Sequence, residues 1–338
     1  MNEKVLAKCN TLLANRDEIA ARFKFGHSLM NIAAALVFSG AKKEVDVQKL
    51  KECKKLLEKN TGAFSSFQAN AKPVIVSKMA ISEDPEKYLE DIKTVYKKIS
   101  KGMFKDNGYL VSAAASVCDA GRADEVDAIA ERFKELYKKM NKKHPLLTSS
   151  SDIVFVMLLV LTDKDVDTIV DEMEECYEYM KKELKLRVSA NEIQGVSEVL
   201  TLTGGDVKEK SDKVVKIFNT FKEHGAKYGT SYNEFGSLGA LIDIDIDTDK
   251  LVDEIIETAD FLQSKKGFGS WSMNKKKRLM FAAMLVGDSY SADNAVLNSA
   301  AITSSVAAVI AEEVALMACI TATAATSASH YLKNDVTE

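Results

Sequence analysis

The sequence contains few residues that interrupt helices or form covalent cross-links. Its 338 residues include only 3 prolines and 16 glycines, which argues against a turn-rich all-β chain and favours helices. The five cysteines are widely separated, odd in number and without a C-x-x-C pair, a pattern typical of reduced cytosolic thiols rather than of a disulfide framework. The first residues lack an apolar stretch of signal-peptide length, so we expect a cytoplasmic protein.

Histidine is also scarce, and its four copies form no catalytic or metal-binding motif. His27, His144, His224 and His330 occur singly, without an H-E-x-x-H run. Ser237 stands in F-G-S-L-G, which is not the G-x-S-x-G elbow, and no D-D-x-x-D run is present to hold magnesium and diphosphate. We therefore predict no catalytic residue, no metal and no cofactor. A nucleophile and a histidine that meet only in the fold remain an open alternative.

The residues that are abundant indicate a large globular core. Hydrophobic residues make up 46% of the chain and charged residues 28%, enough for a core of one to three domains. The formal net charge is only −4, so no overall field favours nucleic acid or an anionic membrane.

A helical pattern recurs along the chain at intervals of about 41 residues. Five copies begin with an acidic residue, which stabilises a helix start, and most end near lysines, which stabilise a helix end. More apolar segments alternate with these copies and are expected to line the core. We predict an all-α fold of six to seven tandem α-hairpins, stacked as an α-solenoid or closed into an α/α toroid. The last apolar residues of the five copies, at spacings of 41, 40, 41 and 41, are Ile99, Met140, Met180, Phe221 and Leu262.

The domain prediction follows from where this pattern ends. It breaks down after Gly287, so residues 1–288 are predicted as the helical-hairpin domain and 289–338 as an Ala/Ser/Thr-rich helical segment packed on the last repeat. Glu312 and Glu313 interrupt the apolar part of this segment, which favours a buried helix over a membrane span. Small residues follow a heptad spacing that suits close contact with another helix, within the chain or in a homodimer. This self-association candidate comprises Ala308, Ala311, Ala315, Ala318 and Ala322.

An aspartate-rich stretch, LIDIDIDTDKLVDEI at 241–255, resembles a calcium-binding loop. Asp243, Asp245 and Asp247 alternate as in such loops, and a glutamate stands at the twelfth position. The position that requires glycine is Thr248, however, and Asp247 is the acidic helix start of the recurring pattern. We therefore predict a helix boundary rather than a metal site.

The segment KKGFGSWSMNKKKR, residues 265–278, contains the only tryptophan, two glycines and four consecutive basic residues. The favoured interpretation is a turn in which Trp271 is a hydrophobic anchor and the lysines are solvated. The alternative is an anion cradle, which gains support because a basic run at a helix start opposes the helix dipole. The cradle would comprise Gly267, Gly269, Ser270, Lys275 and Lys276.

Three segments and the alanine-rich tail carry a resemblance to a known family. The runs FKFGHSLMNIAAALVFSGAKKEVDVQKL, GAFSSFQANAKPVIVSKMAI and MNKKHPLLTSSSDIVFVMLLVL resemble the family of domains of unknown function numbered 4003, over nearly the whole chain. The resemblance implies a bacterial, cytoplasmic protein. It assigns no activity and no functional residue.

Two hypotheses of function remain. The first is a non-enzymatic helical-repeat scaffold that binds another protein, since stacked hairpins present extended surfaces. The second is an enzyme or small-molecule binder with a pocket inside an α/α toroid. A polar-lined cavity between the apolar helices would favour the enzyme, whereas a continuous dry core would favour the scaffold. Nucleic-acid and membrane partners are not expected, because helix ends already explain the lysine clusters.

Overall fold

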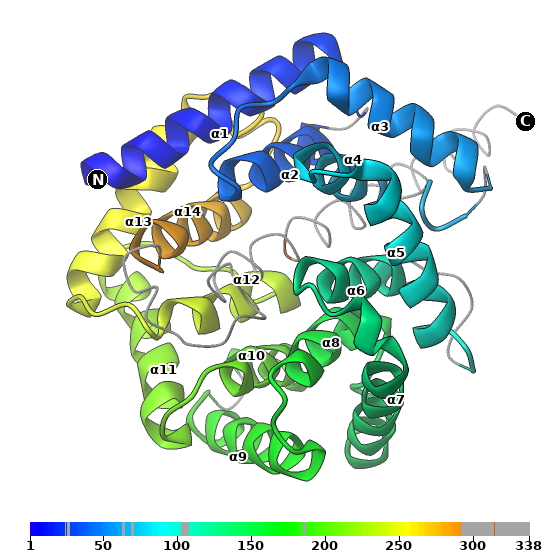
Figure 1. Ribbon diagram of the computed structural model, residues 1–338. Coiled ribbons are helices and arrows are strands. Elements are labelled where there is room, and N and C mark those ends of the chain that lie inside the picture. Colours follow the sequence, from blue (N-terminus) through cyan, green and yellow to red (C-terminus); the bar gives the residue numbers. More distant parts are fainter. Residues whose placement is uncertain are drawn as a thin grey trace, which may run out of the picture.

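The fold is all-helical, as the sequence predicts. The computed structural model describes residues 1–23, 25, 28–62, 65–68, 71–102, 108–184, 187–291 and 314, and every regular element within them is a helix (Figure 1). None of these helices has the length and hydropathy that a membrane-spanning segment needs. The self-association candidate Ala308, Ala311, Ala315, Ala318 and Ala322 lies outside the described residues.

The helices fall into two alternating sets. The odd-numbered set comprises α1 (Glu3–Arg22), α3 (Val47–Asn60), α5 (Pro85–Ile99), α7 (Val126–Lys143), α9 (Val166–Leu184), α11 (Val207–Glu223) and α13 (Thr248–Gln263). The even-numbered set comprises α2 (Ser28–Gly40), α4 (Lys72–Ile81), α6 (Gly108–Asp119), α8 (Ile153–Leu161), α10 (Ala190–Leu202), α12 (Tyr232–Gly236) and α14 (Lys275–Ser291). Short 3-10 helices are η1 (Ala123–Glu125), η2 (Ser150–Asp152) and η4 (Ser237–Leu241).

Aspartate side chains define the starts of five odd-numbered helices. Each accepts a hydrogen bond from a backbone N–H of the first turn, where these groups lack partners within the helix. The capping residues are Asp46 of α3, Asp84 of α5, Asp165 of α9, Asp206 of α11 and Asp247 of α13. Glu125 before α7 is different, because its side chain makes no cap and instead pairs with Arg122 at 2.5 Å.

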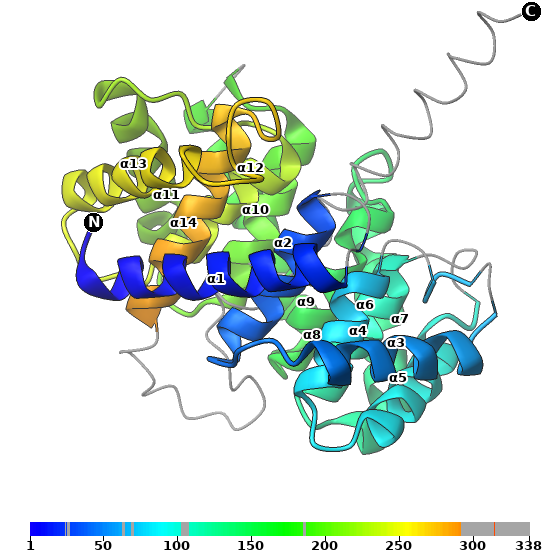
Figure 2. The ribbon, with the colours of Figure 1, turned by 90° about the horizontal axis from the view of Figure 1, so that it is seen from above.

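The odd-numbered helices lie outside the even-numbered helices (Figure 1). Consecutive outer helices contact one another from α1 to α13, and α1 also packs against α13 and α14. Figure 2 shows α1 lying across α14, so the two ends of the described helical region meet.

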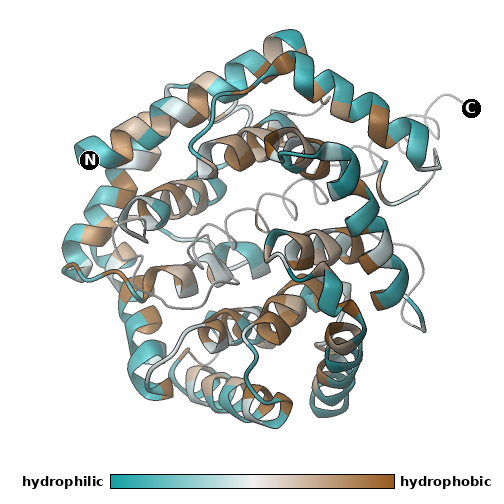
Figure 3. Ribbon diagram, in the orientation of Figure 1, coloured by the Kyte–Doolittle hydropathy of each residue, from teal (hydrophilic) through white to brown (hydrophobic). Residues whose placement is uncertain are grey.

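Hydropathy follows these two layers (Figure 3). Every residue of α8 is buried, whereas α5 buries only the face formed by Leu89, Ile92, Val95 and Ile99. Such a one-sided apolar stripe is typical of a helix that covers a core. The buried apolar residues of both layers form one continuous cluster, which Val314 also joins.

Cations of the outer layer satisfy carbonyl groups at the ends of inner helices. The Nζ atom of Lys210 is buried and donates to the carbonyl oxygens of Leu200 at 2.8 Å and Thr203 at 3.3 Å. Arg132 donates in the same way to the carbonyl oxygen of Val160 at 3.1 Å. Because the last carbonyls of a helix have no partner within it, these cations stabilise the ends of α10 and α8.

Candidate functional site

The aspartate-rich stretch forms the approach to α13. Asp247 accepts hydrogen bonds from the N–H groups of Asp249 at 3.1 Å and Lys250 at 3.3 Å, which places the helix boundary where the sequence predicts it. Before it, Asp243 lies between two carbonyl groups, those of Ile242 and Ile244, that both accept from Lys213. The backbone here therefore has a structural partner. That Asp243, Asp245 and Asp247 bind no metal stays a prediction.

The loop between α13 and α14 differs from the favoured interpretation. Trp271 is 104% exposed, so the prediction that it is a hydrophobic anchor is wrong. Phe268 is the buried anchor instead, at 0% exposure, and its ring packs against that of Phe281 with centroids 6.1 Å apart. Burying Phe268 three residues earlier in the same turn leaves the indole directed into solvent.

The anion-cradle candidates lie on this loop and on the first turn of α14. Gly267 has a φ of +85°, a conformation that favours glycine, and a Cβ there would lie 3.2 Å from the Nη1 atom of Arg16. Gly269 and Ser270 follow in the turn, where the carbonyl of Gly269 accepts from the N–H groups of Ser272 and Met273. Lys275 and Lys276 open α14. Anion binding by this set stays a prediction.

Ser237, Cys9 and Cys53 have no histidine partner among the described residues. Ser237 is buried, lies 2.7 Å from the hydroxyl of Tyr228 and donates to the carbonyl oxygen of Glu234 at 2.6 Å. Burial raises the pKa of Cys9 to about 12 and that of Cys53 to about 11, which keeps both thiols protonated and poorly nucleophilic.

A buried carboxyl–tyrosine cluster joins three inner helices. The hydroxyl oxygen of Tyr232, at the start of α12, lies 2.9 Å from a carboxyl oxygen of Asp152 and 2.9 Å from one of Glu198. Asp152 directly precedes α8, Glu198 lies within α10, and both are 0% exposed. The Gln194 side chain donates to Glu198 at 3.3 Å, and its own carbonyl oxygen is buried without a partner. Among the described residues, no cationic side chain bonds to either carboxyl group of this cluster.

Burial without a neighbouring cation determines the protonation of the cluster. It raises the pKa of Glu198 well above its usual range, and the adjacent Asp152 raises it further. Burial also raises the pKa of Asp152, although hydrogen bonds from the Ser149 N–H, Tyr232 and Glu198 oppose this effect. The arrangement fits a neutral Glu198 that donates to the carboxylate of Asp152.

Local sequence makes the close approach of these groups feasible. Residue 195 of α10 is glycine, and a Cβ atom there would lie 2.5 Å from the ring of Tyr232. The ring can pack against α10 only because Gly195 has no side chain. Asp152 is held by a capping box, in which its carboxylate accepts from the N–H of Ser149 at 2.5 Å. No motif in the sequence predicts this cluster. Its one local signal is a glutamate, Glu198, within the apolar stretch of α10.

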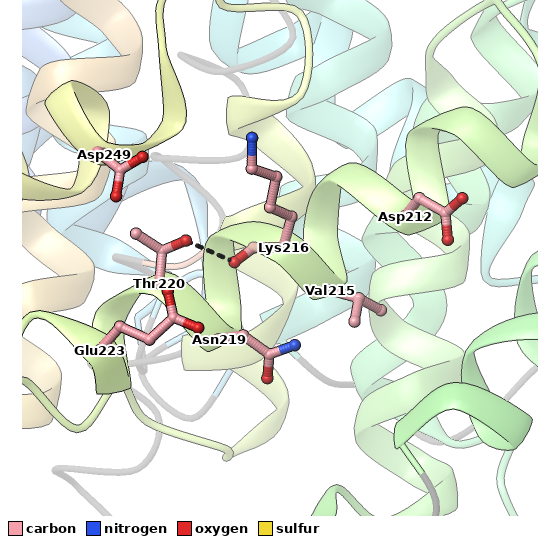
Figure 4. A pocket seen from close by; sticks show the side chains of 7 residues that line it. All are labelled: Asp212, Val215, Lys216, Asn219, Thr220, Glu223 and Asp249. Atoms are coloured by element: carbon pink, nitrogen blue, oxygen red, sulfur yellow. Dashed lines mark hydrogen bonds between the residues drawn. The ribbon is translucent and has the colours of Figure 1, made fainter.

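A groove follows the exposed face of α11 (Figure 4). This α11 groove has a volume of about 410 Å³, and its walls are polar and apolar in nearly equal measure. Asp212 and Asp249 lie on opposite sides of it, and the carbonyl oxygen of Lys216 accepts from Thr220 at 3.0 Å (Figure 4). The lining residues are Asp212, Val215, Lys216, Asn219, Thr220, Glu223 and Asp249.

The neighbouring helices fix the edges of the α11 groove. Tyr179 of α9 donates to Asp212 at 2.5 Å, and Arg187 donates to Asn219 at 2.8 Å. On the other side, the two ring nitrogens of His224 lie 2.6 Å from Asp253 and 2.9 Å from Asp249. Hydrogen bonds to Asp253 and Asp249 raise the pKa of His224, so the protonated ring joins α11 to α13 more readily.

Comparison with known proteins identifies the family and adds no site. Neither a curated protein nor a solved structure matches the chain. The model of one family, described as protein of unknown function (DUF4003), matches residues 15–315, nearly the whole chain. The chain therefore belongs to the DUF4003 family.

Proposed function

We propose that the chain is a non-enzymatic helical-repeat scaffold that binds a protein partner in the α11 groove. The observation that carries this proposal is the groove itself, which is open, lined by charged side chains and bordered by three neighbouring outer helices. Sites for small molecules are usually enclosed and lined mainly by apolar groups, whereas the polar parts of protein interfaces lie on open surfaces. Three carboxylates and one lysine line the groove, so a segment with basic residues is its best electrostatic match.

The same proposal includes the architecture and setting of the scaffold. We infer hairpins of about 41 residues closed into an α/α toroid, supported by the helix starts at Pro85, Val126, Val166, Val207 and Thr248 and by the packing of α1 on α13 and α14. The continuous apolar core between the two layers supports a scaffold. We further infer that the scaffold acts in the bacterial cytoplasm, an inference that the sequence resemblance supports.

Site-specific photo-crosslinking tests the groove. A photoreactive amino acid is placed at Asn219 in the groove or at Lys138, an exposed residue at the corresponding position of α7. We expect a crosslinked second polypeptide from host cells only with the probe at 219, and expect Asp212→Lys with Asp249→Lys to remove it. Equal products from both positions, or none from 219, would contradict the proposal.

The second candidate is an enzyme or small-molecule binder, and the carboxyl–tyrosine cluster favours it. Carboxyl groups with raised pKa values are found at active sites more often than elsewhere. A thermal-shift screen of metabolites against wild-type protein and Glu198→Gln distinguishes the candidates. A compound that stabilises only the wild-type protein supports the enzyme.

A further inference from the structure

The loop between α13 and α14 carries a tryptophan whose apolar side chain is exposed to solvent. Trp271 is 104% exposed, and among the described residues the only other large apolar side chain with comparable exposure is Leu146, at 98%. An indole buries more apolar area than almost any other side chain when a partner covers it. Isolated exposed apolar residues are common on protein surfaces, so the surroundings of Trp271 decide its meaning.

Hydrogen bonds from two buried arginine side chains hold the backbone of the loop that carries Trp271. Arg278 is 3% exposed, and its Nη1 atom donates to the carbonyl oxygens of Phe268 at 3.0 Å and Met273 at 3.1 Å. Arg16, from the other end of the chain, donates to the carbonyl oxygen of Lys266. Two buried guanidinium groups therefore fix the backbone on both sides of the indole. A fixed loop loses little conformational entropy when a partner binds it.

Positive charge surrounds the exposed indole. Lysines precede and follow it in the loop and on the first turn of α14, where the positive end of the helix dipole adds to their field. None of these lysines has an ion-pair partner within the part of the chain that the structure describes. By contrast, Lys87 and Lys139 on the outer helices lie 2.6 Å from aspartate oxygens. These lysines without an ion pair, named here the loop lysines, are Lys265, Lys266, Lys275, Lys276 and Lys277. The Nζ atom of Lys265 also lies 4.4 Å from the centre of the Phe261 ring, a cation–π contact within the chain.

We propose that this loop is a second docking surface, on which Trp271 enters an apolar pocket of an acidic protein partner while the loop lysines face its carboxylates. One large aromatic anchor within a charged rim is the usual anatomy of a binding hot spot. A lipid surface fits less well, because adsorption to a bilayer increases with the apolar area inserted. The loop offers a single exposed apolar side chain, since Phe268 and Met273 are buried. This surface is separate from the α11 groove and does not depend on the function proposed there.

The chain contains one tryptophan, so its own fluorescence reports whether this surface is occupied. A phage-displayed random peptide library is selected on the wild-type protein after depletion on Trp271→Ala. We expect the selected peptides to combine Asp and Glu with an apolar residue, and a synthetic copy to shift the emission to shorter wavelength. Because Trp271 is fully exposed, the alanine variant should keep the wild-type circular dichroism spectrum and thermal stability.

Variants separate the anchor from the charges. We expect Trp271→Ala to weaken binding of the selected peptide about thirtyfold, as at a hot spot. Replacing Lys275, Lys276 and Lys277 together by Gln should weaken it about fivefold, with most of this difference lost at high salt. The matched control for Trp271→Ala is Leu146→Ala, since both side chains are fully exposed. The matched control for the triple lysine variant replaces Lys51, Lys55 and Lys208 by Gln, because these three lysines are exposed on α3 and α11. Both controls should bind like the wild-type protein.

Three results would overturn the proposal. Selected peptides without an excess of acidic residues would remove the charge argument, and peptides that bind without a shift in emission would remove the anchor. If vesicles of phosphatidylglycerol shift the emission and the peptides do not, the surface binds lipid rather than protein. Crosslinking from Asn219 should persist in Trp271→Ala, so failure at this loop is distinguishable from failure at the α11 groove.

Discussion

The carboxyl–tyrosine cluster predicts that the protein loses stability as the pH rises above the ordinary range of carboxyl groups, and Glu198→Gln tests this. The folded-state pKa of Glu198 lies well above the unfolded value of about 4.3. Between these two pKa values the folded chain binds more protons than the unfolded chain. The stabilisation is therefore complete below pH about 4 and is lost as the pH rises through the folded-state pKa. Asp152 contributes with the same sign, because its pKa is also raised.

The size of the effect follows from proton linkage. Each pH unit within this window lowers the free energy of unfolding by about 1.4 kcal/mol for each extra proton held by the folded chain. The glutamine side chain of the Glu198→Gln variant would still donate a hydrogen bond to Asp152 but has no proton to lose. We expect this substitution to make the dependence on pH shallower, so that the variant gains stability relative to the wild-type protein as the pH increases.

Urea unfolding at a series of pH values, followed by far-ultraviolet circular dichroism, measures this difference. The control is Glu90→Gln, because Glu90 is a carboxyl group on α5 with 62% of its side chain exposed. The control should follow the wild-type curve, whereas Glu198→Gln should diverge from it. Parallel curves for wild-type protein and Glu198→Gln would refute the inference that the buried pair retains a proton.

Three substitutions test the core. Leu158→Asp would bury a carboxylate in α8 and should lower the free energy of unfolding by more than about 4 kcal/mol. The whole helical signal should then be lost in one transition, whereas a separate, unperturbed N-terminal transition would argue against a shared core. Gly195→Ala should cost about 1–3 kcal/mol through overlap with the Tyr232 ring, whereas Gly204→Ala, with open space around it, should change thermal stability little. Lys210→Met leaves two carbonyl groups unbonded at the end of α10 and should cost about 1–3 kcal/mol in urea unfolding; no loss would show that water replaces the amine.

Local chemistry allowed the sequence to predict the helices. An aspartate before an apolar periodic segment caps the backbone within its own first turn, so Asp84, Asp206 and Asp247 mark helix starts without any information from the rest of the chain. The same argument correctly placed Asp247 at a helix start within a stretch that resembles a calcium loop. Burial of one helix face, as in α5, is likewise visible as a periodicity of 3.6 residues.

The loop between α13 and α14 shows where local information ended. Phe268 and Trp271 are both aromatic residues of one glycine-containing turn, and nothing in the pattern distinguishes the buried one. The choice depends on Arg278 and on Arg16, which is 250 residues from the carbonyl group that it binds. The sequence therefore predicted a turn with an aromatic anchor but assigned the anchor to the wrong residue.

The carboxyl–tyrosine cluster depended entirely on tertiary structure. Asp152 and Tyr232 are 80 residues apart, and Glu198 is 34 residues from Tyr232, so no spacing rule connects them. In the sequence, Asp152 is one acidic residue after a run of serines, and Glu198 is one polar residue within an apolar segment. Packing of α8, α10 and α12 brings both carboxyl groups out of water and against one hydroxyl group, and this burial gives them their raised pKa values. Helix positions were determined by short-range hydrogen bonding and periodicity, whereas the electrostatics of the interior were decided by which helices the fold placed side by side.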